Sequence, residues 1–115
     1  MIENLFSQGK SLSAHPVKVL FDFTENTSEP LQAGVTASSR KFKKAVDRNR
    51  VKRILREVYR LQKLPLQHIL KERNLSLALF FIYTGKELPV FAEVYKKMGI
   101  LLQKLQNDIL KPPQS

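Results

Sequence analysis

The chain has 115 residues, no cysteine and a formal net charge of +10, with 20 basic and 10 acidic side chains. A chain of this length buries one modest core, so residues 1–115 are expected to form a single domain. The absence of cysteine excludes a disulfide framework and a thiolate metal site, and the longest apolar run, at residues 77–83, is too short to span a bilayer. With no hydrophobic signal segment at the N-terminus, the expected compartment is the cytoplasm.

The first third of the sequence predicts one helix and two strands. A short helix, with Ile2, Leu5 and Phe6 as its apolar residues, would end near Gly9. Residues 16–23 have apolar side chains at every second position, as expected for a strand with one buried face. That face would hold Val17, Val19, Phe21 and Phe23. Turn-forming polar residues follow at 24–30, and residues 31–38 would form the antiparallel neighbour of this strand.

Most of the positive charge lies in one segment. Residues 38–63 hold eleven of the twenty basic side chains and only two acids, Asp47 and Glu57, which gives a net charge of 11 − 2 = +9. Nearly all of the excess charge therefore falls within less than a quarter of the chain. The natural complement is a partner with closely spaced negative charges, above all a nucleic-acid backbone.

A helix is predicted at residues 45–61 or a little beyond, after a basic loop at 39–44. Its apolar side has the i, i+3, i+4, i+7 spacing, with Val51, Ile54, Leu55, Val58 and Leu61. Another side carries a cationic stripe of Arg48, Lys52, Arg56 and Arg60, widened by Arg50 and Arg53. Like charges four residues apart repel by roughly a few tenths of a kcal/mol, so the stripe does not stabilise the isolated helix. Together with the donor and acceptor groups of Asn49, this favours a binding surface over an ordinary solvated face.

The rest of the sequence predicts two more helical segments and one central strand. Pro65 would end or kink the basic helix, and residues 66–73 would form a further helical piece. Residues 75–84 are apolar at both alternating sets of positions, which is typical of a central strand. After a turn at 85–89, a helix at residues 90–110 would close the core. Its apolar side would hold Phe91, Val94, Tyr95, Met98, Leu101, Leu102, Leu105 and Ile109.

Candidate catalytic groups are few. His15 and His68 are the only histidines, and no Ser/His/Asp or Cys/His set, metal-binding spacing or glycine-rich phosphate loop accompanies them. Glu25 and Glu29 come nearest to a carboxylate pair, but they lie in a polar turn and are better explained as solvated charges. The sequence therefore predicts no catalytic residue and no metal ligand, and it argues against an independent enzyme.

The central part of the sequence resembles a known family. Residues 33–38 (Ala-Gly-Val-Thr-Ala-Ser), 40–41 (Arg-Lys) and 44–57, with Arg-Asn-Arg at 48–50, are similar to the strand, loop and RNR helix of the bacterial ribonuclease P protein component. The resemblance implies an α+β two-layer sandwich with the element order α-β-β-β-α-β-α. It also implies an unusual left-handed βαβ crossover, shared with certain ribosomal protein and translation factor domains, whereas general packing rules favour the right-handed form for parallel strands.

For function, the resemblance implies the protein subunit of ribonuclease P, an endoribonuclease that removes the 5′ leader of precursor tRNA. The RNA subunit would carry out the hydrolysis with magnesium ions, bound mainly by that RNA, so this chain would be a non-catalytic subunit. The expected partners are ribonuclease P RNA and precursor tRNA, with no membrane and no small-molecule substrate. The RNA-binding residues would be Arg40, Lys41, Lys43, Lys44, Arg48, Asn49, Arg50, Lys52, Arg53 and Arg56.

The resemblance also implies a cleft in which aromatic side chains contact the single-stranded leader. Phe6 and Phe21 match such positions, while Ile2 replaces an aromatic residue. Stacking of a base on an aromatic ring contributes about 1–3 kcal/mol and tolerates any base, which suits a leader of variable sequence. Ordinary core packing is the competing interpretation for both phenylalanines.

Other functions stay open on the sequence alone. A general RNA-binding protein or RNA chaperone without ribonuclease P association would share the charge. A DNA-binding module would present more uncharged hydrogen-bonding side chains to base edges than Asn49 alone. Binding to a membrane surface is a weaker alternative, because the apolar side of the basic helix is narrow and lacks aromatic anchors.

Overall fold

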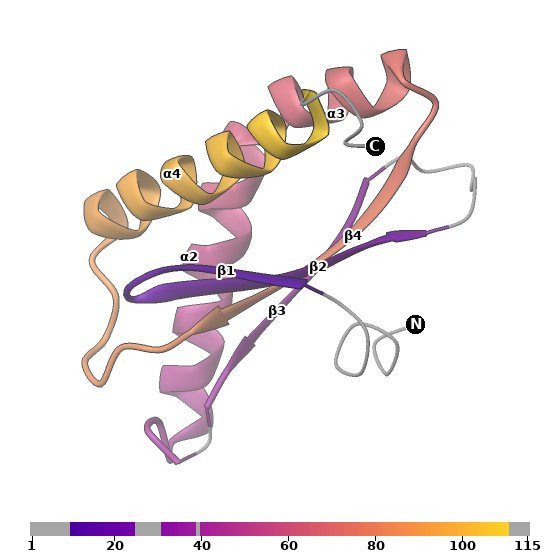
Figure 1. Cartoon of the computed structure of the whole chain (residues 1–115). Coiled ribbons are helices and arrows are strands. Elements are labelled where there is room, and N and C mark those ends of the chain that lie inside the picture. Colours follow the sequence, from indigo (N-terminus) through magenta and orange to yellow (C-terminus); the bar gives the residue numbers. More distant parts are fainter. Residues whose placement is uncertain (1–9, 25–30, 39, 111–115) are drawn as a thin grey trace.

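The computed structural model describes residues 10–24, 31–38 and 40–110, and Figure 1 shows their arrangement. The elements are, in chain order, β1 (Lys10–Ala14), β2 (Val17–Thr24), β3 (Leu31–Ala37), α2 (Ala45–Gln62), α3 (Leu64–Glu72), β4 (Ser76–Tyr83) and α4 (Phe91–Leu110). The strands of these ranges form one sheet in the order β1-β2-β4-β3. The chain thus has the predicted α+β fold, and the helix expected before Gly9 lies outside the described residues.

The pairing of the strands corrects one prediction. Residues 31–38 are not the antiparallel neighbour of residues 16–23, because β3 pairs in parallel with β4. β2 lies between β1 and β4 and is antiparallel to both. The short turn at residues 15–16 suits an antiparallel hairpin, whereas a parallel pair requires a long connection such as the one through α2 and α3. The residue pattern alone does not locate β1, because Leu12 is its one large apolar side chain.

The two helical segments around Pro65 are separate helices, as predicted. α3 begins two residues before the expected boundary, since Pro65 occupies its first turn, where the N–H that proline lacks has no helical partner. The predicted central place of β4 is confirmed by its pairing with β2 on one side and β3 on the other. The left-handed sense of the connection from β3 through α2 and α3 to β4 stays a prediction.

One face of the sheet forms the core together with α2, α3 and α4 (Figure 1). Its residues in the core cluster are Val17, Val19, Phe21, Leu31, Ala37, Leu77, Leu79, Phe81 and Tyr83, and the partly buried Leu12, Ala14 and Val35 pack against them. The strand registers place all of them on the same side. The helices contribute Val51, Leu55 and Val58 from α2, Leu66 and Leu70 from α3, and Val94, Met98, Leu101, Leu102, Leu105 and Ile109 from α4. Each large apolar side chain that becomes fully buried contributes roughly 1.5–3 kcal/mol.

Four predicted core positions are exposed instead. Phe23 is 47% exposed, Leu61 is 49% exposed, and Phe91 and Tyr95 are each 41% exposed. All four lie towards the ends of their elements, where the apolar pattern continues but no opposing layer covers it. The rings of Phe91 and Tyr95 stack on each other with centroids 6.1 Å apart, which removes part of their surface from water.

The opposite face of the sheet is not covered by any described helix. It carries Leu20 from β2 and Phe80 and Ile82 from β4, all half-buried. A Cβ atom added at Gly34 of β3 would lie 2.9 Å from the ring of Phe80, so the missing side chain lets this ring lie close to β3. Among the helices of the described ranges, none combines the length and the hydropathy needed to cross a membrane.

Candidate nucleic-acid interface

The basic loop before α2 is fastened to the sheet at two points. Phe42 is buried, and its ring lies 5.9 Å from that of Tyr83 at the end of β4. Lys41 Nζ donates a hydrogen bond of 2.5 Å to the carbonyl oxygen of Thr84. Within the loop, the Phe42 N–H donates to the carbonyl oxygen of Ser38 at 3.0 Å. Phe42 and Lys41 are therefore held against the sheet, and Lys41 uses part of its hydrogen-bonding capacity within the protein.

Arg48 fastens the same loop from the helix side. Its Nη1 donates to two carbonyl oxygens, that of Phe42 at 2.8 Å and that of Lys43 at 2.9 Å. The residue before the helix, Lys44, makes no side-chain capping bond, so Arg48 supplies the side-chain link between the loop and the first turns of α2. Arg48, which the sequence predicts to bind RNA, therefore stabilises the loop in this chain. These two bonds leave the other N–H donors of its guanidinium group unused.

The other predicted residues on α2 are presented to solvent. Asn49, Arg50, Arg53 and Arg56 are exposed, and Lys52 is half-buried. A concavity of about 480 Å³ lies on this side of the helix, lined by Val46, Asp47, Asn49, Arg50, Arg53 and Arg56. We call this set the RNR concavity. The exposed side chains Arg40, Lys41, Lys43 and Lys44 extend the positive charge along the loop.

The charges of the RNR concavity are not neutralised by the described part of the protein. The one ion pair within the described residues joins Arg60 and Glu57, which do not line the concavity and whose side chains are 61% and 45% exposed. Hydrogen bonding with Arg60 lowers the pKa of Glu57, and the same contact raises the pKa of Arg60. Arg50, Arg53 and Arg56 make no such pair within the described residues, and Asp47 is the single acid beside them. The arrangement suits binding of an external polyanion.

The two predicted leader-binding residues have different outcomes. Phe6 lies outside the described residues. Phe21 is 5% exposed and belongs to the core cluster on the face of the sheet that α2 and α4 cover. This placement favours core packing, the competing interpretation of the sequence, because a ring within the core offers no free face to a base. A contact between Phe21 and the leader stays a prediction.

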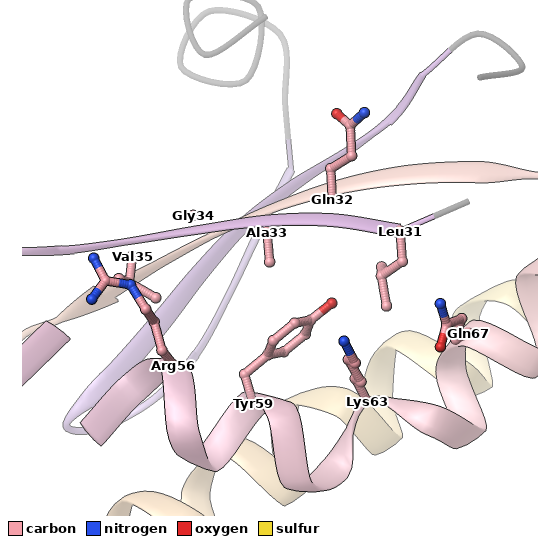
Figure 2. Close-up of a pocket in the computed structure, with 9 residues that line it drawn as sticks. All are labelled: Leu31, Gln32, Ala33, Gly34, Val35, Arg56, Tyr59, Lys63 and Gln67. Atoms are coloured by element: carbon pink, nitrogen blue, oxygen red, sulfur yellow. The ribbon is translucent and has the colours of Figure 1, made fainter. Parts of the chain in front are cut away.

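A second group of polar side chains lies beside the RNR concavity and was missed by sequence reasoning. Tyr59, Lys63 and Gln67 line a groove between α2, α3 and β3, and Arg56 belongs to both the groove and the RNR concavity (Figure 2). The signal was available, since these residues follow Arg56 at spacings of three, four and four. Such spacing places them along one side of continuous helical structure.

No catalytic or metal centre is evident in the residues that the structure describes. They include no cluster of three or more His, Cys, Asp or Glu side chains that could hold a metal ion. His15 lies in the turn between β1 and β2, where its Nδ1 is 3.4 Å from Thr84 Oγ1, whereas His68 is exposed on α3. These residues do not fit a magnesium site of the protein's own.

Comparisons of sequence lead to one family. The family model described as Ribonuclease P matches residues 1–106. The ribonuclease P protein component of Porphyromonas gingivalis is 32% identical over 109 residues, which covers 94% of this chain and 80% of that protein. The protein of the same name from Idiomarina loihiensis is 33% identical over 97 residues, or 76% of this chain and 75% of that one.

Comparisons of structure agree. The RNase P protein of Staphylococcus aureus superposes with a TM-score of 0.71 at 18% identity, over 91% of this chain and 88% of that one. The RNase P protein of Thermotoga maritima, solved in complex with 1-(4-fluorophenyl)-2-thiourea, gives a TM-score of 0.66 at 23% identity, over 90% and 92%. At these identities the likeness establishes the fold.

Proposed function

Because this chain belongs to the ribonuclease P protein family, we propose that it is the protein subunit of a bacterial ribonuclease P in the cytoplasm. It binds the RNA subunit and the 5′ leader of precursor tRNA, and so assists maturation of the tRNA 5′ end. The observation that carries this proposal is the RNR concavity, whose guanidinium groups make no ion pair with the described carboxylates.

Contact with the RNA subunit would be made by the RNR concavity and the basic loop. Arginine offers a planar fork of donors that matches phosphate oxygens, and each phosphate neutralised releases counterions into solution. The helix and the fastened loop hold these cations in place before RNA arrives, which reduces the ordering cost of binding. Asn49 would add hydrogen bonds to bases or sugars.

The leader would lie on the open face of the sheet, and its contact with Phe21 stays a prediction. This face carries the half-buried Leu20, Phe80 and Ile82, which give an apolar platform on which bases of any sequence could pack. Phe6, the other aromatic residue suggested by the resemblance, would contribute from outside the described residues.

Hydrolysis would be carried out by the RNA subunit with the magnesium ions that this RNA binds. The protein would contribute positive charge near the RNA phosphates, and therefore a lower magnesium requirement. Its binding of the leader would also raise the affinity for precursor tRNA over mature tRNA, which lacks that segment.

Reconstitution tests the proposal. The protein is combined with a bacterial ribonuclease P RNA at low magnesium, and release of the leader from precursor tRNA is followed. We expect faster cleavage with the protein than without it. Equal rates would contradict the assignment, and equal affinity for unrelated structured RNAs would favour the alternative of a general RNA-binding protein.

A further inference from the structure

The groove between β3 and the helices has walls of different chemistry. Its lining residues are Leu31, Gln32, Ala33, Gly34 and Val35 from β3, and Arg56, Tyr59, Lys63 and Gln67 from the helical side, around a volume of about 420 Å³. In Figure 2, Leu31, Ala33 and Val35 point towards the helices, while Gln32 points to the other side of the strand. Arg56, Tyr59 and Lys63 reach towards β3 from below. One wall is thus apolar and the other is cationic.

The small side chain of Ala33 keeps this groove open. It leaves room in front of Tyr59, whose ring lies 5.4 Å from the ring of Phe81 in the core. β3 is also an edge strand, paired on one side with β4, so its other backbone edge faces away from the sheet. Hydrogen-bonding groups on that edge are available to a ligand.

The polar groups that point into the groove lack partners in the described part of the chain. Tyr59 Oη has no hydrogen bond there, and neither Arg56 nor Lys63 forms an ion pair. Burial raises the pKa of the Tyr59 phenol, which keeps the hydroxyl protonated and able to donate. No buried side-chain polar atom of the described residues lacks a partner, so the Tyr59 hydroxyl is open to water and can exchange that water for a ligand.

We propose that this groove binds one unpaired nucleotide of an RNA strand. The base lies between the apolar side chains of β3 and the Tyr59 hydroxyl, and the phosphate lies between Arg56 and Lys63. The volume falls within the range of about 300–1,000 Å³ typical of small-ligand pockets, and is far too small for a duplex. This inference rests on the proposed RNA-binding function and adds a second kind of contact to it. Arg56 links the two sites, so a strand bound at the RNR concavity reaches the groove directly.

A titration with a nucleotide tests the groove without the RNA subunit. Adenosine 5′-monophosphate is added to the ¹⁵N-labelled full chain, and backbone amide shifts are followed by NMR. We expect saturable shifts at residues 31–35 and at Lys63, and weaker binding of adenosine or inorganic phosphate alone. If inorganic phosphate shifts the same amides with equal affinity, the groove is a simple anion site and the proposal is overturned. Shifts confined to residues 46–53 would overturn it as well.

Matched variants give a second test. Ala33→Leu places a larger side chain in the groove at an exposed position, whereas Ala92→Leu makes the same change at an exposed position on α4 outside the groove. We expect Ala33→Leu to abolish the nucleotide shifts and weaken binding of ribonuclease P RNA about 5- to 10-fold, in line with the loss of about one net hydrogen bond. Ala92→Leu should change neither. Tyr59→Phe keeps the ring contact with Phe81 but removes the hydroxyl, and should weaken the nucleotide shifts several-fold.

The outcomes separate this inference from the function on which it rests. If Ala33→Leu binds the nucleotide and the RNA as the unchanged protein does, the inference fails while stimulation of cleavage stands. If the unchanged protein does not stimulate the RNA subunit, the proposed function fails, and the nucleotide titration still decides for or against the groove.

Discussion

Arg48 and Arg50 lie two residues apart on the same helix, and their surroundings are opposite. Arg48 is half-buried and bonded to two loop carbonyl oxygens, whereas Arg50 is exposed in the RNR concavity. The basic segment therefore contains two kinds of cation. Some hold the loop in place, and the others are exposed and able to bind a ligand. Counting charge cannot separate them, but substitution can, because the first kind should affect stability and the second kind affinity.

The largest effect is expected from the exposed arginines. Replacing both Arg50 and Arg53 with alanine should weaken binding of ribonuclease P RNA about 100-fold, or roughly 1.4 kcal/mol per arginine, because each loses charge-assisted bonds to phosphate. The slope of log affinity against log salt should flatten by about 0.7–0.9 for each phosphate that the variant no longer neutralises. Filter binding across a salt series measures both quantities. An unchanged slope would show that these arginines do not bind phosphates.

Lys104→Ala is the matched control for that experiment. Lys104 is exposed on α4, away from the basic segment, and its removal changes the net charge by one unit at a place where no RNA contact is proposed. Its effect on affinity should stay within about two-fold, since exposed charges beyond a Debye length are largely screened. Urea unfolding should give the same stability for the control, the double variant and the unchanged protein to within about 0.5 kcal/mol.

Arg48 should behave in the opposite way. Arg48→Ala leaves the carbonyl oxygens of Phe42 and Lys43 without their shared donor, and we expect a loss of about 1–2 kcal/mol in the free energy of unfolding. Amide shifts should change along residues 40–44, because the loop is no longer fastened to the helix. Urea unfolding and NMR measure these effects. If Arg48→Ala left the stability unchanged and reduced the affinity for RNA, Arg48 would be an RNA-binding residue like Arg50 and not a stabilising one.

Residue patterns predicted what depends on neighbours along the chain. The apolar spacing within α2 identified Val51, Leu55 and Val58 as buried, because positions three and four apart share a side of any helix. The same rule predicted that Phe91 and Tyr95 are buried, which is wrong. Periodicity indicates which side of a helix a residue lies on, but it does not indicate how far the opposing layer extends.

Features that depend on distant partners were out of reach. The parallel pairing of β3 with β4 depends on how α2 and α3, which connect the two strands along the chain, pack on the sheet. Nothing in residues 31–38 specifies this pairing. The separation of Arg48 from Arg50 depends on where two carbonyl oxygens of the preceding loop come to lie. The groove at Tyr59 depends on the small side chain of Ala33 in β3, more than twenty positions earlier in the chain.

A smaller effect, on the pH dependence of stability, is expected from the burial of Tyr59. Burial raises its pKa above the usual value of about 10, so the folded state holds the proton more tightly than the unfolded state. Its stabilising contribution is complete below about pH 10 and is lost as pH rises towards the folded pKa. Tyr59→Phe should remove this loss, by at most about 1 kcal/mol between pH 10 and 11, because the open groove lets solvent reduce the effect. Urea unfolding at the two pH values measures it, and identical pH dependence in both proteins would contradict the assignment.

The smallest effect should come from Arg60, the cation that already has an acidic partner. Its Nη2 and Nε donate to the two carboxylate oxygens of Glu57 at 2.5 and 3.2 Å, so its field is partly cancelled before RNA binds. Arg60→Ala should therefore weaken RNA binding less than Arg53→Ala, and Glu57→Gln should strengthen it slightly by releasing Arg60. Since the hydrogen bond lowers the pKa of Glu57, the pair persists at neutral pH. Its contribution to stability is present above the usual pKa of about 4.3 and is lost as pH falls through the lower folded value. Equal losses of affinity for Arg60→Ala and Arg53→Ala in parallel filter-binding experiments would mean that pairing with Glu57 does not decide which arginines serve the RNA.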